Sequence, residues 1–172
     1  MTRLRFLPQV LVAIAWFALS GCAGYQLGTG AAPKFTTLFV APVTSEALIP
    51  QARELVTTQV REAFIKDGRV RLVDSPAEAD AVLQITLAGY DRSVAVSRQD
   101  DTGLARRFDV SLRALATLTN ERTKEALFVR RPITAKRGVF TDSGLVPSEY
   151  QALPLLAQQL AGDITHSVLD TW

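Results

Sequence analysis

Apolar residues recur at helical spacing in two stretches of the chain, and each stretch predicts an amphipathic helix. The first begins at Pro50, a residue suited to a first helical turn, and stops before Gly68, a residue typical of helix C-termini. The second runs to the C-terminus, with Pro154 in its expected first turn and residues 138–150 before it as a loop. The two stripes are Ala52, Leu55, Val56, Val60, Ala63 and Phe64, and Leu153, Leu156, Ala157, Leu160, Ile164 and Val168.

Apolar and polar residues alternate in the remaining stretches, and this period of two predicts β-strands. Residues 82–118 are expected to form one long antiparallel hairpin. The apolar phase shifts at Gly89, as it does at a β-bulge, and Pro132 favours an edge position for the last strand. The predicted strands cover residues 35–43, 69–74, 82–96, 108–118 and 127–135.

These elements follow the order strand, helix, strand, long strands, helix. Packing both helices on the same face of a sheet is the economical way to bury both apolar stripes. The sequence therefore predicts an α+β fold with two helices packed on one face of a mixed, mainly four-stranded β-sheet. Residues 35–172 are long enough for a single α/β globular domain with its own core.

The N-terminus has the three-part pattern of an export signal. Arg3 and Arg5 precede an apolar run that is too short to span a membrane, and the sequence "LSGC" ends at Cys22, the only cysteine of the chain. This tetrad predicts a lipoprotein signal peptide over residues 1–21, with acylation of Cys22. Residues 22–34 then form the lipidated N-terminus and a short tether. The alternative is ordinary cleavage after Ser20, which leaves Cys22 as a plain thiol.

The environment of Cys22 bears on localisation. A lone exposed thiol is a liability in an oxidising compartment, and acylation removes it. One acyl chain binds a membrane marginally, whereas two or three anchor a protein stably. Ala23, rather than aspartate, follows Cys22, which favours the outer membrane in the usual bacterial sorting rule. We therefore expect a lipid-anchored protein on the periplasmic side of the outer membrane.

Charge separates along the chain although it balances overall. Without Arg3 and Arg5 the basic residues equal the 17 acidic ones, so net charge gives no argument for a nucleic-acid partner. Between Arg92 and Arg137, however, basic residues clearly outnumber acidic ones, and from Gly138 onward the chain has aspartate and glutamate but neither lysine nor arginine.

Candidate chemistry is sparse, and we predict neither an enzyme nor a cofactor. His166 is the single histidine and has no cysteine or second histidine to complete a metal site. The glycines near the N-terminus open no phosphate-binding loop. A periplasmic hydrolase that uses Asp100 and Asp101 is an alternative, but adjacent loop aspartates more often form turns.

Several segments together resemble the LptE family of lipopolysaccharide-assembly lipoproteins. The resemblance runs through "GCAGYQL", "LFVAPV", "ELVTTQVREAFIKDGRVRLVD", "AEADAVLQITLAGY", "RRFDVSLRALATL" and "LLAQQLAGDITHSVLDTW". It implies two helices against a mainly four-stranded sheet and a non-enzymatic role. It further implies that the protein plugs the outer-membrane β-barrel LptD, helps that barrel to assemble, and assists lipopolysaccharide delivery to the outer leaflet.

This role suggests a use for the basic stretch. Lipopolysaccharide carries phosphates and acidic sugars, which arginine and lysine bind through charge-assisted hydrogen bonds. The alternative interpretations are contact with a polar barrel lumen and ordinary solvated strand faces. The candidates are Arg92, Arg98, Arg106, Arg107, Arg113, Arg130, Arg131, Lys136 and Arg137.

A second functional hypothesis keeps the lipid anchor and changes the partner. An outer-membrane lipoprotein of this size can activate a peptidoglycan synthase from across the periplasm. Such a protein usually needs a long tether, and here about a dozen residues separate Cys22 from the first predicted strand. The short tether favours a partner within the membrane.

Overall fold

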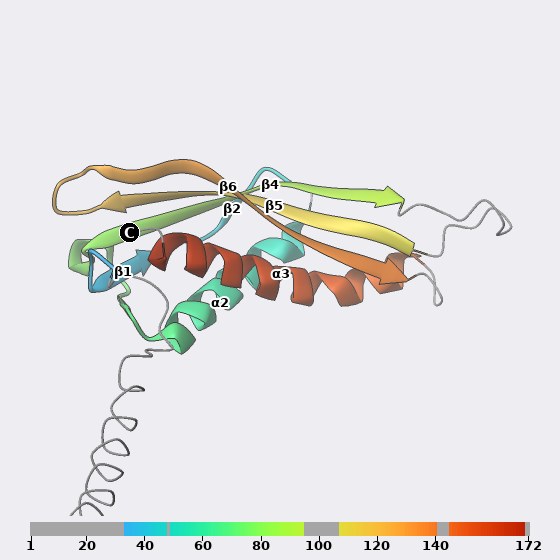
Figure 1. Cartoon of the computed structure of the whole chain (residues 1–172), viewed down its shortest axis with the longest axis horizontal. Coiled ribbons are helices and arrows are strands. Elements are labelled where there is room, and N and C mark those ends of the chain that lie inside the picture. The colour runs from blue at the N-terminus through green and yellow to red at the C-terminus, as the bar shows by residue number, and fades with distance from the viewer. Residues whose placement is uncertain (1–32, 48, 95–106, 141–144, 171–172) are drawn as a thin grey trace, which may run out of the picture.

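The structure is a computed structural model that describes residues 33–47, 49–94, 107–140 and 145–170. Cys22, Arg98 and Arg106 lie outside these ranges. Figure 1 shows a long twisted sheet with two helices beneath it. The elements are β1 (Thr37–Val40), β2 (Thr44–Ser45), α2 (Pro50–Asp67), β3 (Arg71–Leu72), the short 3-10 helix η2 (Pro76–Glu78), β4 (Ala81–Val94), β5 (Arg107–Asn120), β6 (Ala126–Phe140) and α3 (Leu145–Leu169).

The sheet is mixed, as the sequence predicts. Within the described ranges it has six strands in the order β3-β1-β4-β5-β6, with β2 also paired to β4. β1 pairs in parallel with β3 and β4, whereas β4, β5 and β6 form an antiparallel meander. The sheet thus has six strands rather than mainly four. β3 lies within the predicted strand 69–74 but has only two residues, and β2, also of two residues, was not predicted.

Both helices pack on one face of the sheet, which confirms the predicted fold class. α3 contacts β5, β6 and α2, while α2 also contacts β2 and β3. The inward side chains of β5 come from every second residue, as a pleated strand requires. The largest fully buried side chains are Phe64, Leu38, Leu83, Ile85, Leu87, Leu112, Leu118, Leu156, Leu160, Ile164, Leu169 and Val56.

The segment between the last strand and the second helix is more ordered than predicted. β6 continues to Phe140 and α3 begins at Leu145, so most of the predicted loop 138–150 is regular structure. Pro154 is therefore inside α3 rather than in its first turn. The helix continues past it because buried residues on both sides, Ala152 and Leu156 among them, pack on the sheet.

The predicted bulge is present where the apolar phase shifts. The register between β4 and β5 slips between Leu87 and Gly89, so that Tyr90 takes over the inward phase opposite Leu112. A second irregularity lies between β5 and β6, where Arg130 adopts a positive φ of 45° and its N–H donates to Thr117 Oγ1 at 3.0 Å. These slips bend the long strands locally.

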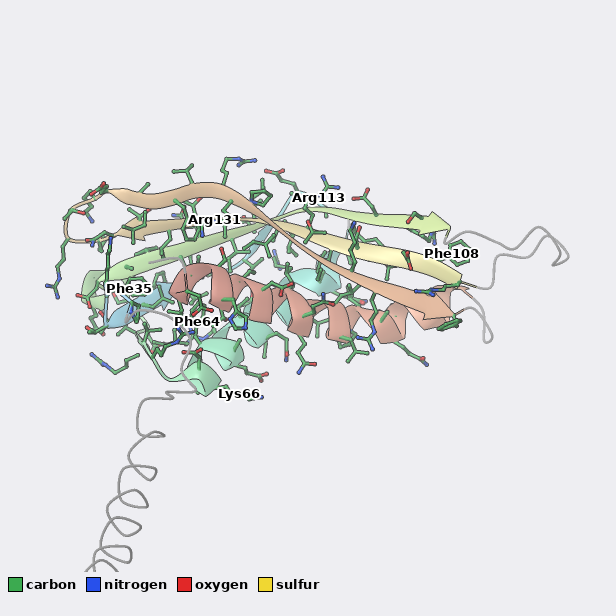
Figure 2. All side chains as sticks on the ribbon, in the orientation of Figure 1. Phe35, Phe64, Lys66, Phe108, Arg113 and Arg131 are labelled. Atoms are coloured by element: carbon green, nitrogen blue, oxygen red, sulfur yellow. The ribbon has the colours of Figure 1, made fainter. Side chains whose placement is uncertain are left out.

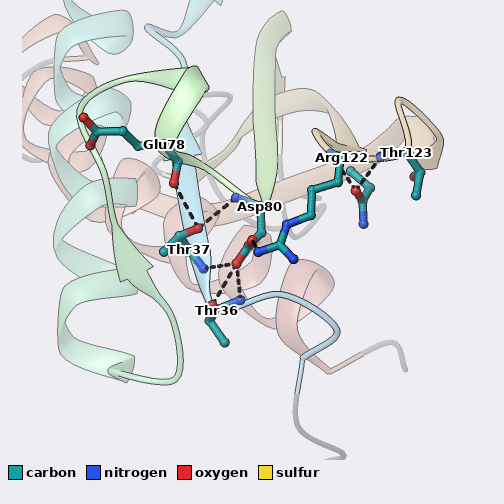
Figure 3. A network of polar contacts seen from close by, with 7 residues as sticks. Thr36, Thr37, Glu78, Asp80, Arg122 and Thr123 are labelled. Carbon is teal, nitrogen blue, oxygen red and sulfur yellow. Dashed lines mark hydrogen bonds and ion pairs between the residues drawn. The ribbon is translucent and has the colours of Figure 1, made fainter.

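An aspartate at the start of β4 joins three segments that are distant in sequence (Figure 3). Asp80 Oδ2 accepts hydrogen bonds from the N–H of Thr36 at 3.0 Å, from Thr36 Oγ1 at 2.8 Å and from the N–H of Thr37 at 3.0 Å. Its other oxygen pairs with Arg122 in the β5–β6 turn. The hydrogen bonds from Thr36, followed by those from Thr37, hold the pKa of Asp80 well below its ordinary value.

Two helix-associated glycines should respond oppositely to alanine. Gly68 ends α2 with φ of +74°, where a side chain is strained, whereas Gly162 lies inside α3 with open space around its Cα. We expect Gly68→Ala to lower the free energy of unfolding by about 1 kcal/mol and Gly162→Ala to raise it by about 0.5 kcal/mol. Urea denaturation of both variants checks this pair. Equal effects of the same sign would contradict it.

Candidate interaction surface

The face of the sheet away from the helices has charged residues at one end. On β5, Val110 and Leu112 point towards the helices, so Arg107 and Arg113 point the other way. Lys136 is opposite Ser111 on β6 and shares this uncovered face. Figure 2 shows Arg113 above the sheet, on the side away from the helices.

The cations of this face stand beside anions. Arg113 forms an ion pair with Asp91 across β4 and β5. Arg107 Nε is 3.8 Å from Asp109 Oδ1, and the Arg107 guanidinium also lies 5.8 Å from the centre of the Phe140 ring. Since each of these side chains is about half exposed, the pairs contribute little to stability. The surface is therefore of mixed charge and can exchange its internal partners for those of another molecule.

Arg92, Arg131 and Arg137 belong to the helix side of the sheet instead. Arg92 and Arg137 are both opposite Val110, a fully buried residue, so their side chains leave the sheet in the direction of the helices. Both are nevertheless exposed, at the end of the sheet away from η2. The row of basic residues predicted from sequence is thus divided between two faces.

Arg131 has a structural environment. Its Nη1 donates to the backbone carbonyl of Ser167 at 2.9 Å and contacts Ser167 Oγ at 3.1 Å, which ties β6 to the end of α3. The same guanidinium lies 4.0 Å from the centre of the Phe128 ring. The bulge residue Arg130 is exposed next to it, near the opposite end of the sheet from Arg107.

The role of Arg131 can be tested by a conservative change. Arg131→Lys keeps the charge but loses the planar group that stacks on Phe128 while it bonds Ser167. We expect the free energy of unfolding to fall by about 1–2 kcal/mol. The matched variant Arg130→Lys, on an exposed side chain, should change it by less than about 0.5 kcal/mol. Chemical denaturation compares the two variants, and equal losses would contradict a structural role for Arg131.

A groove of about 490 Å³ lies between α2 and α3, lined among others by Lys66, Asp67, Gln158 and His166. Next to it the charges form a chain. Arg69 Nε donates to Asp67 Oδ1 at 2.7 Å, Arg69 Nη1 donates to Asp170 Oδ1 at 2.6 Å, and His166 Nδ1 lies 2.6 Å from Asp170 Oδ2. Hydrogen bonds from His166 and then Arg69 hold the pKa of Asp170 below its ordinary value. This chain fastens the ends of the two helices.

His166 is exposed, and its contact in this chain is Asp170, one turn further along α3. Among the residues that the structure describes, no group of three histidine, cysteine, aspartate or glutamate side chains could hold a metal ion. Likewise, no helix in the described part of the chain is long and apolar enough to cross a membrane.

The fold and these surfaces define a class of small α+β domains, with two helices on one face of a mixed sheet and charged residues on the other. The chain belongs to the LptE family, described as lipopolysaccharide-assembly, whose model matches residues 35–168. The family consists of non-enzymatic lipoproteins that work in lipopolysaccharide transport. The resemblance found in the sequence is thereby confirmed.

Solved structures share the fold at low sequence identity. The uncharacterized lipoprotein B of Nitrosomonas europaea has a TM-score of 0.55 at 15% identity, with 86% of this chain and 88% of that chain covered. A hypothetical protein of Chlamydia trachomatis has a TM-score of 0.54 at 12% identity, covering 77% and 95% of the two chains. A protein of Xanthomonas campestris has a TM-score of 0.54 at 14% identity, covering 78% and 85%. No curated protein sequence matches the chain.

Proposed function

We propose that this protein is an outer-membrane lipoprotein that plugs the LptD β-barrel, helps it to assemble and assists lipopolysaccharide delivery to the outer leaflet. The observation that carries the proposal is the LptE family match over residues 35–168, which runs from before β1 to the last turn of α3. In the proposed maturation, residues 1–21 are removed, Cys22 is acylated, and residues 22–34 connect the anchor to the domain.

The short tether supports a partner within the membrane. Fourteen residues, 23–36, separate Cys22 from the start of β1, and an extended chain spans at most about 3.5 Å per residue. The domain is therefore held within about 5 nm of the lipid surface. A peptidoglycan synthase across the periplasm is a poorer fit to this reach, and no feature of the described domain favours it.

We assign the contacts with the barrel lumen or with lipopolysaccharide first to the uncovered sheet face, at Arg107, Arg113 and Lys136. The anionic neighbours of Arg107 and Arg113 are about half exposed, so phosphates or acidic barrel residues can replace them at little cost. Arg92 and Arg137 are second candidates at the same end of the sheet. Arg131 is the weakest candidate, because the core-facing contact with Ser167 already uses its guanidinium.

The experiment is a mild-detergent pull-down of the full-length acylated protein from its own envelope, with mass identification of proteins recovered in stoichiometric amount. Recovery of one large β-barrel per copy is the expected result. Recovery of a peptidoglycan synthase, or of no partner, would overturn the proposal. The double variant Arg113→Gln with Lys136→Gln should reduce barrel or lipopolysaccharide recovery, whereas Arg53→Gln with Lys66→Gln on α2 is the matched control.

A further inference from the structure

β6 is an edge strand with two different halves. Within the described ranges it pairs with β5 on one side, and no strand pairs with its other side. Its first half has the bulge at Arg130 and the proline at position 132, two devices that protect sheet edges from pairing with other chains. Its second half, residues 133–140, has neither a bulge nor a proline, and is protected only by the charges of Lys136 and Arg137, which disfavour pairing with another cationic edge.

The backbone of residues 133–140 is arranged so that a further strand can pair with it. Residues 133–140 pair with residues 107–114 of β5 in continuous register, from Ile133 opposite Ala114 to Phe140 opposite Arg107. In such a ladder, alternate residues direct their N–H and C=O groups away from the partner strand. The outer side of this segment therefore presents regularly spaced backbone donors and acceptors.

A groove runs beside this edge, between the end of β6 and α3. It has a volume of about 190 Å³ and is lined by Arg137, Gly138, Val139, Phe140, Gln151, Ala152 and Leu155. Leu155, on the α3 side of this groove, is 41% exposed, whereas the ring of Phe140, which is 62% exposed, lies beside Arg107 on the uncovered face. An edge strand with a groove beside it is an arrangement that can accept an added peptide strand.

The positive charge of β6 determines which kind of segment can pair with its outer side. β6 contains Arg130, Arg131, Lys136 and Arg137 and no aspartate or glutamate. A second copy of this chain, paired edge to edge, would bring the same cations of both copies together, which disfavours self-association. An acidic segment would instead meet Lys136 on the uncovered face and Arg137 on the helix side.

We propose that residues 133–140 of β6 and the adjoining flank of α3 form a strand-addition site for an extended, acidic segment of a partner protein. Backbone hydrogen bonds from the outer side of β6 supply the affinity. The apolar part of the groove, at Val139, Ala152 and Leu155, takes an apolar side chain of the incoming strand, and Lys136 and Arg137 select acidic ones. This site is argued from the edge and its groove and does not depend on the barrel proposed above.

The test uses full-length acylated protein in detergent micelles and a synthetic capped peptide of about eight residues that alternates glutamate with valine. Hydrogen exchange of backbone amides is the readout. We expect slower exchange in residues 133–140 and no change at β3, the other edge of the sheet. A peptide that alternates lysine with valine should give no protection, and an acidic peptide with alternate N-methylated amides should also fail.

Charge reversal provides the matched pair of protein variants. Lys136→Glu with Arg137→Glu should weaken binding of the acidic peptide at least about tenfold and allow the lysine peptide to protect the same amides. Arg53→Glu with Lys66→Glu on α2 makes the same change in net charge and should leave acidic-peptide binding intact. Backbone-amide hydrogen exchange in each double variant without peptide is compared with that of the unchanged protein, which verifies that both variants fold.

Three results would overturn the proposal. One is no protection of residues 133–140 at millimolar peptide. Another is equal protection by the N-methylated peptide, which would mean that side chains alone bind. The third is protection that rises with protein concentration when no peptide is present, which would identify a second copy as the occupant. Each of these results is independent of whether a β-barrel is recovered in the pull-down.

Discussion

Replacing Cys22 with serine is expected to move the protein from the membrane fraction to the soluble periplasmic fraction. Serine is close to cysteine in size, but it offers no thiol for attachment of the diacylglycerol. Each buried methylene of an acyl chain contributes about 0.8 kcal/mol, so loss of two or three chains removes essentially all membrane affinity of the anchor. Fractionation of the envelope followed by immunodetection measures the change.

The neighbouring change Ala23→Ser is the control, because it keeps the cysteine and alters the next residue by one hydroxyl group. It should remain in the membrane fraction and show the mass of an acylated N-terminus. Wild-type-like membrane recovery of Cys22→Ser would contradict the lipoprotein assignment. Mass spectrometry of the N-terminal peptide would then distinguish cleavage after Ser20 from retention of residues 1–21.

Asp80→Ala is expected to lower the free energy of unfolding by about 3 kcal/mol at neutral pH. The substitution leaves the N–H groups of Thr36 and Thr37 without their acceptor and removes the partner of Arg122. The Asp80 side chain is only 13% exposed, so water replaces these bonds poorly. Denaturation midpoints of the variant and of the native chain measure the loss.

The contribution of Asp80 should also depend on pH in a defined direction. Its pKa is lowered in the folded protein, so the unfolded chain binds the proton more readily. The contribution is therefore complete above the unfolded pKa of about 4 and declines as the pH falls below that value. The difference in stability between the native chain and Asp80→Ala should narrow as the pH is lowered from about 4 towards 2.

Asp74 provides a matched control. Its side chain is 95% exposed, and its Oδ1 lies 3.2 Å from Arg61 Nη2. Asp74→Ala should change the free energy of unfolding by less than about 0.5 kcal/mol at neutral pH. A loss as large as that of Asp80→Ala would contradict the specific role of the Asp80 contacts.

Periodicity predicted the fold well wherever an element has one buried and one exposed face. The stripe from Ala52 to Phe64 gave α2, and the phase shift at Gly89 located the bulge. The true length of α3 was missed because Pro154 suggested a helix start, although buried neighbours hold the helix on both sides of it. β3 lies within the predicted strand 69–74 but is shorter, and β2 was too short for any period to mark it as a strand.

The interaction surface was less predictable because it depends on register. Sequence spacing grouped nine basic residues, but strand pairing sends Arg113 and Lys136 to the uncovered face and Arg137 to the other. The contact of Arg131 with Ser167 joins residues from different elements and leaves no mark in the local sequence. The groove beside Phe140 and Leu155 likewise exists only once β6 and α3 are side by side.

The position of Asp80 has a mechanical consequence. β1 is the first strand of the described domain and lies inside the sheet, with parallel ladders to β3 and β4. If Cys22 is acylated as proposed, a force applied through that anchor along β1 loads these ladders in shear, so their hydrogen bonds must fail together rather than one after another. Asp80 adds its own bonds at Thr36 and Thr37, where that force arrives. Under such a load, the domain is fastened at its N-terminal strand, where the proposed anchor would pull.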